Sequence, residues 1–158
     1  MNIYGVIQSQ YLSALAMLKQ AIARCPENLW DDPQDQDWSW FKAYHALYYA
    51  HLYLQPTRKD FVPWRGHGKP ISTRTLSKEE VLEYLVFVEQ EVVRRVPLTD
   101  LEAESGFRNI RVDKLELQFV SIRHIQQHAG ELYERLGTRG NVKLDWAEQR
   151  NGHRRSSK

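Results

Sequence analysis

The segment Phe119-Val-Ser-Ile-Arg-His-Ile-Gln-Gln-His-Ala-Gly-Glu-Leu132 carries two histidines, His124 and His128, four residues apart. It lies inside a longer pattern of apolar residues at helical spacing, which predicts a helix from about Asp113 to Leu136. Side chains at positions i and i+4 of a helix project from one face, one turn apart. The two imidazoles can therefore reach a single point, which suits Zn, Ni, Fe or Cu when a third ligand comes from elsewhere.

The best candidate for the third ligand is His45, in an aromatic-rich segment that predicts a helix from about Trp38 to Leu54. The side of this helix expected to face inward holds His45 together with Phe41, Tyr48 and Leu52. His51 stands about 120° around the same helix from His45. We therefore expect His51 at the rim of the site or in contact with solvent.

The spacing of these histidines also allows a different interpretation, because histidines often occupy helix surfaces or hydrogen-bonded core positions without a ligand. Two further histidines lie outside the predicted helices. His67 belongs to Arg65-Gly-His-Gly-Lys69, which lacks the glycine spacing and the Lys-Ser/Thr ending of a phosphate loop, and His153 lies near the C-terminal end. We expect that neither of them, nor His51, binds the ion.

Length and composition predict one globular domain of 158 residues that can bury a substantial apolar core. A single cysteine, Cys25, excludes an internal disulfide framework and fits a reducing cytoplasm, and we expect its thiol to be a small buried group. The apolar runs are too short to span a membrane, and the first residues lack a signal-peptide pattern. These features predict a cytoplasmic protein.

Charge is unevenly distributed, since the last twenty residues contain six basic and two acidic side chains in a chain of net charge +2. Nucleic-acid binding requires basic residues spread over a folded face with helical or aromatic readers. A terminal basic tail does not provide this, so nucleic acid is not expected as a partner.

The connector from Glu27 to Asp37 is acidic, but a calcium loop starting at Asp35 would lack its glycine and its final glutamate. Asp37 is expected instead to cap the following helix.

Four helices account for most of the chain. The first is expected from about Asn2 to Ala23, and the third begins at the capping box Ser77-Lys-Glu-Glu80 and ends at Pro97. Gly137 is expected to end the fourth helix, and Gly130 inside it suggests close helix approach or access for a ligand beside His128. No strand pattern competes. The prediction is an all-α four-helix bundle with a long connection, Gln55 to Leu76, between helices two and three.

Three stretches together resemble the DinB/YfiT-like family: Tyr44-His-Ala-Leu-Tyr-Tyr-Ala-His-Leu-Tyr-Leu54, Leu76-Ser-Lys-Glu-Glu-Val-Leu-Glu-Tyr-Leu85 and Ile122-Arg-His-Ile-Gln-Gln-His-Ala-Gly-Glu-Leu132. The resemblance covers residues 1–146 and leaves 147–158 as a basic tail. It implies a four-helix bundle, often dimeric, with a divalent ion such as Zn, Ni or Fe held by His45, His124 and His128. At His51 the related pattern often has an acid, which leaves any role of that position open.

The same resemblance implies an enzyme that acts on a small molecule. Relatives include thiol-dependent transferases and an isomerase that use low-molecular-weight thiols of the bacillithiol or mycothiol type, and the chain is expected to be such an S-transferase or a hydrolase. Glu131 lies on the same helical face as the histidine pair, where it could orient an imidazole, move a proton or remain a surface residue. Tyr48 and Tyr49 are expected to form an aromatic wall that shapes substrate access.

Two alternatives to this activity concern the class of protein. A zincin peptidase is excluded because Ile125-Gln-Gln127 separates the histidine pair and offers no glutamate base. A non-catalytic, metal-stabilised bundle that works through binding or dimerisation remains open. A homodimer is expected from the resemblance and from the aromatic excess of the second helix, with some of Trp38, Trp40, Tyr44 and Tyr53 covered by the partner.

Overall fold

The computed structural model describes residues 2–66 and 74–147, and within these ranges the regular elements are all helices. The long helices are α1 (Ile3–Arg24), α3 (Ser39–Tyr53), α4 (Lys78–Arg95) and α5 (Lys114–Gly140). Shorter elements are α2 (Glu27–Trp30) and the 3-10 turns η1 (Arg58–Asp60), η2 (Trp64–Gly66) and η3 (Val96–Leu98). The all-α prediction is confirmed for this part of the chain.

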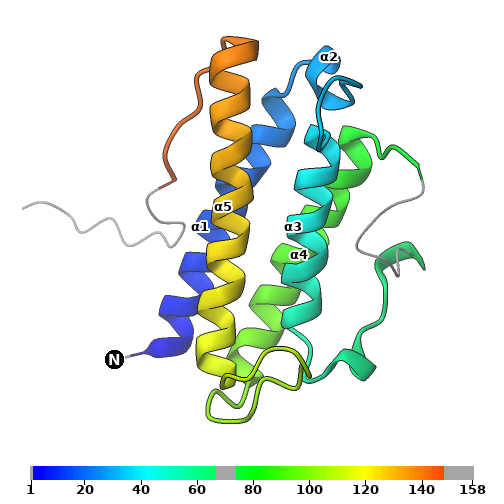
Figure 1. The fold of residues 1–158 in the computed structure, drawn as a ribbon. Coiled ribbons are helices and arrows are strands. Elements are labelled where there is room, and N and C mark those ends of the chain that lie inside the picture. The colour runs from blue at the N-terminus through cyan, green and yellow to red at the C-terminus, as the bar shows by residue number, and fades with distance from the viewer. Residues whose placement is uncertain (1, 67–73, 148–158) are drawn as a thin grey trace, which may run out of the picture.

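The four long helices lie side by side (Figure 1). Helix α5 packs along α1 and α3, and helix α4 packs along the same two helices. Helix α1 carries apolar residues at helical spacing, and all of them are buried: Ile7, Tyr11, Leu15, Leu18 and Ile22. The corresponding stripe of apolar residues on α4 is buried as well: Val81, Leu85, Val88 and Val92. The core therefore lies between the four helices, and the α3–α5 contact is the one that matters for the histidines.

Local capping explains where two helices begin. The Ser77 hydroxyl accepts from the backbone N–H of Glu80 at 3.2 Å, and the Glu80 carboxylate accepts from the N–H of Ser77 at 2.9 Å, as the capping box predicts. At the start of α5, the Asp113 carboxylate accepts from the N–H of Glu116 at 2.7 Å. Helix α1 ends before Cys25, whose side chain is buried as expected.

Asp37 does not cap α3. The residue at the N-cap is Trp38, which makes no side-chain capping bond, and the Asp37 carboxylate instead lies 3.6 Å from the ammonium of Lys42. Its backbone carbonyl accepts from the guanidinium of Arg135 at 2.7 Å. Contacts with other helices therefore decide the conformation of Asp37, and the local capping preference does not.

The end of α5 also differs from the prediction, because the helix continues through Gly137 to Gly140 and Asn141 forms the left-handed cap with φ 50°. Arg135 and Arg139 in these last turns form ion pairs with Asp35, and Arg139 pairs with Asp32 at 2.5 Å. These contacts with the acidic connector hold the extra turn in place. The helical hydrogen bonds continue where a glycine alone would favour termination.

The connection between α3 and α4 lies against the helices over its first part. The Phe61 ring is 5.2 Å from that of Tyr48, and the Trp64 ring stacks on Tyr84 at 4.7 Å. Val62, between these two aromatic residues, is exposed.

His67 and His153, which are predicted not to bind the ion, lie outside the described residues. In the described part of the chain, no helix combines the length and the apolar character needed to cross a bilayer.

Candidate metal centre

The site starts with the histidine pair on α5. His124 and His128 lie one turn apart on a continuous helix, their ring centroids are 4.6 Å apart, and their Nε2 atoms are 3.1 Å apart. A nitrogen ligand lies about 2.0–2.1 Å from zinc, so two ligands of one ion are roughly 2.8–3.4 Å apart for angles between a right angle and the tetrahedral angle. The two Nε2 atoms already have the separation that a shared ion requires.

The third imidazole comes from α3. The ring centroid of His45 is 5.1 Å from that of His124 and also 5.1 Å from that of His128. One ring nitrogen from each of the three residues can be chosen so that all lie within 4.8 Å of one another. The packing of α3 against α5 therefore brings together three potential ligands that the sequence separates widely.

The hydrogen bonding of His45 also fits an ion. The Nδ1 atoms of His45 and His124 are buried and have no hydrogen-bond partner among the described residues. A buried polar atom without a partner costs about 1–3 kcal/mol. Coordination through Nδ1 would offset this cost at His45, whereas His124 faces His128 through Nε2 and its Nδ1 would stay without a partner.

Glu131 lies behind the histidine pair on the same face of α5. Its carboxylate accepts from Nδ1 of His128 at 3.0 Å, from the ammonium of Lys42 at 2.8 Å and from the amide of Gln127 at 3.2 Å. A carboxylate only accepts, so His128 carries its proton on Nδ1 and presents the Nε2 lone pair toward His124. This is the arrangement by which an outer carboxylate orients a metal-binding imidazole.

Burial and neighbouring charges set the protonation of the site. Burial lowers the pKa of His124 to about 4, with further lowering from His128 and His45, and burial followed by the proximity of His128 lowers the pKa of His45. Burial alone would raise the pKa of Glu131, but hydrogen bonds from Lys42 and His128 lower it to about 2. Near neutral pH, His45 and His124 are uncharged, as ligands must be, and Glu131 is ionised.

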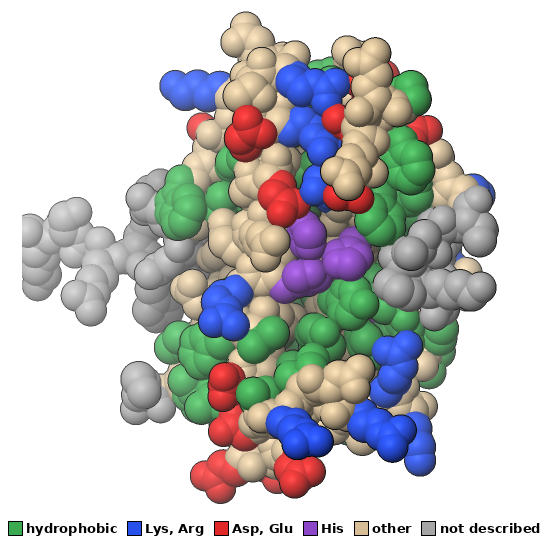
Figure 2. Space-filling view, in the orientation of Figure 1, with side chains coloured by type: hydrophobic (Ala, Val, Ile, Leu, Met, Phe, Trp, Pro, Cys, Tyr) green, Lys and Arg blue, Asp and Glu red, His purple; other side chains and the backbone are tan. Residues whose placement is uncertain are grey.

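The histidines are only partly buried, and Figure 2 shows histidine side chains at the surface in the middle of the face formed by α3 and α5. Phe41 and Tyr49 line the α3 side, with ring centroids 5.6 Å and 4.8 Å from His45, and Tyr49 is also 5.4 Å from His124. The expected wall therefore contains Tyr49. Tyr48 is instead fully buried, where it packs on Phe61, so it is not at the surface through which a substrate would enter.

The prediction for His51 is wrong. Its side chain is 2% exposed and lies between α3 and α4, where Nδ1 is 3.1 Å from the Tyr84 hydroxyl and the ring contacts Phe61 and Phe87. Burial lowers the pKa of His51 to about 4. It is a neutral core histidine rather than a residue at the rim.

One residue of the site, Lys42, was not anticipated, and one expectation about Gly130 is wrong. Lys42 joins α3 to Glu131 and Asp37 from three residues before His45, and the only sequence signal for it is this near-helical spacing. Gly130 requires neither close approach of another helix nor special geometry, since a Cβ placed there would meet nothing within 4 Å. Close packing therefore does not explain this glycine.

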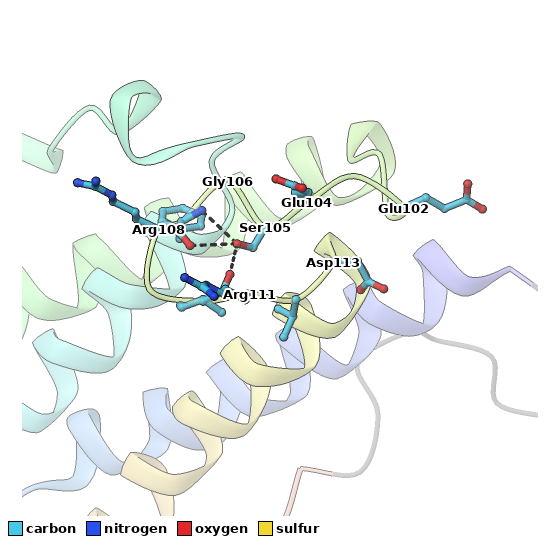
Figure 3. A pocket seen from close by; sticks show the side chains of 10 residues that line it. Glu102, Glu104, Ser105, Gly106, Arg108, Arg111 and Asp113 are labelled. Atoms are coloured by element: carbon cyan, nitrogen blue, oxygen red, sulfur yellow. Dashed lines mark hydrogen bonds between the residues drawn. The ribbon is translucent and has the colours of Figure 1, made fainter.

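Away from the histidines, the connection 102–113 between η3 and α5 forms a hollow of about 780 Å³ (Figure 3). The Ser105 hydroxyl at its centre donates to the Ile110 carbonyl and accepts from the N–H of Phe107 at 3.1 Å. Its charged residues are exposed and of both signs: Glu102, Glu104, Arg108, Arg111 and Asp113. The polar groups thus hold the loop together, and the histidine group remains the stronger candidate for chemistry.

Comparisons of the chain with protein-family models, with curated proteins and with solved structures find no match. Any assignment to the DinB/YfiT-like family therefore rests on the sequence resemblance, and the geometry of the three histidines has to be judged by itself.

Proposed function

We propose that this protein is a metal-dependent enzyme that acts on a small molecule, with one divalent ion bound by His45, His124 and His128. The observation that carries the proposal is the convergence of these three imidazoles from α3 and α5, with ligand atoms within 4.8 Å of one another. The packing of four long helices side by side is also what a DinB/YfiT-like four-helix bundle would have, and we include that fold in the proposal.

Three neutral imidazoles leave coordination positions open, in contrast to a closed four-ligand structural site. When bound there, a divalent ion supplies Lewis-acid chemistry and favours deprotonation of a thiol or of water. Glu131 orients His128 through Nδ1, Lys42 holds Glu131 in place, and Tyr49 offers an aromatic surface beside the histidines. The reaction class we propose is transfer of a low-molecular-weight thiol of the bacillithiol or mycothiol type, or hydrolysis.

Two further parts of the proposal concern the setting of the enzyme. The single buried thiol of Cys25 is compatible with a reducing cytoplasm. A homodimer is proposed from the family resemblance. The chain itself covers Trp40 and Tyr44, so of the four expected aromatic residues a partner would cover Trp38, which is 39% exposed, and the partly buried Tyr53.

The first test is metal analysis of the purified protein and of single variants. We expect about one divalent ion per chain in the wild type, and sharply lower occupancy in His45→Ala, His124→Ala and His128→Ala, because two nitrogens hold an ion poorly. His51→Asn is the matched control, since it removes a histidine from the same helix as His45 without touching the site. Equal occupancy in all variants would contradict the proposed centre.

The second test addresses the reaction. Metal-loaded protein is incubated with a panel of electrophiles and each thiol in turn, and thiol adducts are measured by mass spectrometry against protein treated with a chelator. Turnover that disappears on metal removal and in His124→Ala supports the enzyme. A fourth protein ligand in the coordination shell, together with no turnover for any thiol or ester, would favour the non-catalytic, metal-stabilised protein.

A further inference from the structure

Lys114, the first residue of α5, carries a buried ammonium at the opposite end of this helix from Gly140. The residue is 6% exposed, its Nζ donates to the backbone carbonyl of Gln55 at 2.8 Å, and it lies 5.0 Å from the centre of the Phe107 ring. An ammonium has three N–H donors, and this carbonyl satisfies one of them. The position at a helix N-terminus adds partial positive charge around it.

No carboxylate of the described residues forms an ion pair with Lys114. The nearby Arg94 and Arg95 are different, since both bind the carboxylate of Glu91. Burial lowers the pKa of Lys114 to about 8, and the more distant charge of Asp60 opposes this only in part. Buried charges in proteins are normally paired, so a buried ammonium without a counter-charge needs an explanation.

A cavity of about 480 Å³ lies beside this ammonium, and Lys114 is part of its lining. Apolar side chains make up much of the rest: Tyr53, Leu54, Pro56, Leu98 and Ala103. Leu98 is 82% exposed, which leaves an apolar surface available to a ligand. Two acids, Asp100 and Glu104, also line the cavity, but both are exposed to solvent, where their charges are screened.

Gly106, within the 102–113 loop, lines both this cavity and the hollow of about 780 Å³. It has φ +77°, and a Cβ there would lie 2.1 Å from the carbonyl oxygen of Pro56. The loop therefore packs directly on the backbone that follows α3. Lys114 donates to the same backbone segment at the Gln55 carbonyl, so the loop and the start of α5 both contact the residues that follow α3.

We propose that this cavity binds a small monocarboxylate, whose carboxylate pairs with the Lys114 ammonium and whose apolar part contacts Tyr53 and Leu98. A carboxylate supplies the counter-charge that the Lys114 ammonium lacks. It also accepts hydrogen bonds from the N–H groups of Lys114 that do not bind the Gln55 carbonyl. Arg94 and Arg95 also line the cavity, but both are paired with Glu91, so the largely apolar lining beside a single unpaired ammonium favours an organic acid over inorganic phosphate. The site is separate from the histidine group and does not depend on the metal.

The test uses the full chain, treated with a chelator so that no carboxylate can bind a metal ion, and benzoate as the probe with neutral benzamide as its matched analogue. Titrations are followed by NMR shifts of residues around the cavity. We expect saturable binding of benzoate, at least tenfold weaker binding of benzamide, and no displacement of benzoate by equimolar phosphate. His124→Ala should bind benzoate like the wild type.

Two variants locate the site. Lys114→Met removes the charge and keeps a long apolar side chain, and it should weaken benzoate binding at least tenfold, whereas Lys59→Met, which changes an exposed lysine, should leave it unchanged. Should Lys114→Met fail to fold, Ala103→Leu fills part of the cavity with Lys114 intact and should also weaken binding. Equal affinity for benzoate and benzamide, stronger phosphate binding, or undiminished binding in both cavity variants would overturn the proposal.

Discussion

Replacing Glu131 with glutamine is expected to weaken metal binding without removing a ligand. The substitution keeps the shape of the side chain but removes the charge that accepts from His128 at 3.0 Å and from Lys42 at 2.8 Å. Loss of such an outer partner typically costs 10- to 100-fold in metal affinity, or about 1.4–2.8 kcal/mol. We expect the dissociation constant for Zn²⁺ to rise by that factor, as measured by competition with a chromophoric chelator.

The matched control is Glu134→Gln, which makes the same chemical change three residues further along α5 at an exposed position. Its dissociation constant should stay within about twofold of the wild type. An unchanged constant for Glu131→Gln would refute the idea that Glu131 orients His128. If Glu131→Gln raises the dissociation constant and the variant is also inactive when fully loaded with metal, Glu131 takes part in proton movement as well.

Three further predictions concern stability and assembly. Gly106→Ala should lower the free energy of unfolding by at least about 2 kcal/mol in urea, because of its positive φ and the Pro56 carbonyl, whereas Gly130→Ala should raise it by up to about 1 kcal/mol. In metal-free protein, the free energy of unfolding should fall as the pH drops from about 6.5 to 4. Over this range His51 binds a proton in the unfolded chain but not in the folded core, where its pKa is about 4. His51→Asn should therefore reduce the fall in the free energy of unfolding by about 3 kcal/mol or less. Sedimentation at micromolar concentration should give twice the chain mass, and Trp38→Lys should reduce it to one chain if Trp38 lies in the interface.

Local signals were sufficient to predict most of the fold. Helix α4 begins at Ser77 because two reciprocal hydrogen bonds of the capping box satisfy its first N–H groups, and these involve residues three apart. The stripes on α1 and α4 are buried because their apolar spacing leaves one face without polar groups. Such features depend on neighbours within a turn or two, so they can be recognised without knowing the tertiary structure.

The errors lie where distant contacts override a local preference. Gly137 favours the end of a helix, but Arg139 lies one half-turn beyond it and pairs with Asp32, more than a hundred residues earlier. Asp37 has a suitable side chain for a cap, but Lys42 takes its carboxylate. In both cases an ion pair that sequence spacing does not reveal changes the outcome.

For the candidate site too, local sequence patterns predict some residues correctly and miss the effect of distant contacts on others. Helical periodicity correctly places His124, His128 and His45 together, because each points from its helix toward the contact between α3 and α5. The same periodicity places His51 on another face of α3, but it does not show that α4 covers this face with Tyr84 and Phe87. Knowing the direction of a side chain is therefore not enough to know whether it is exposed.

Glu131 shows what the three-dimensional contacts add to such a reading. Its place on the helical face of the histidine pair is compatible with orienting an imidazole, with moving a proton and with a surface position. In the structure both carboxylate oxygens are engaged, by His128, Lys42 and Gln127, and these bonds lower its pKa to about 2. A general base works best when its pKa is near the working pH, and a carboxylate held this acidic is a weak one. We therefore infer that Glu131 is a positioning residue, and that Lys42 makes it one by keeping the carboxylate ionised and directed at Nδ1 of His128.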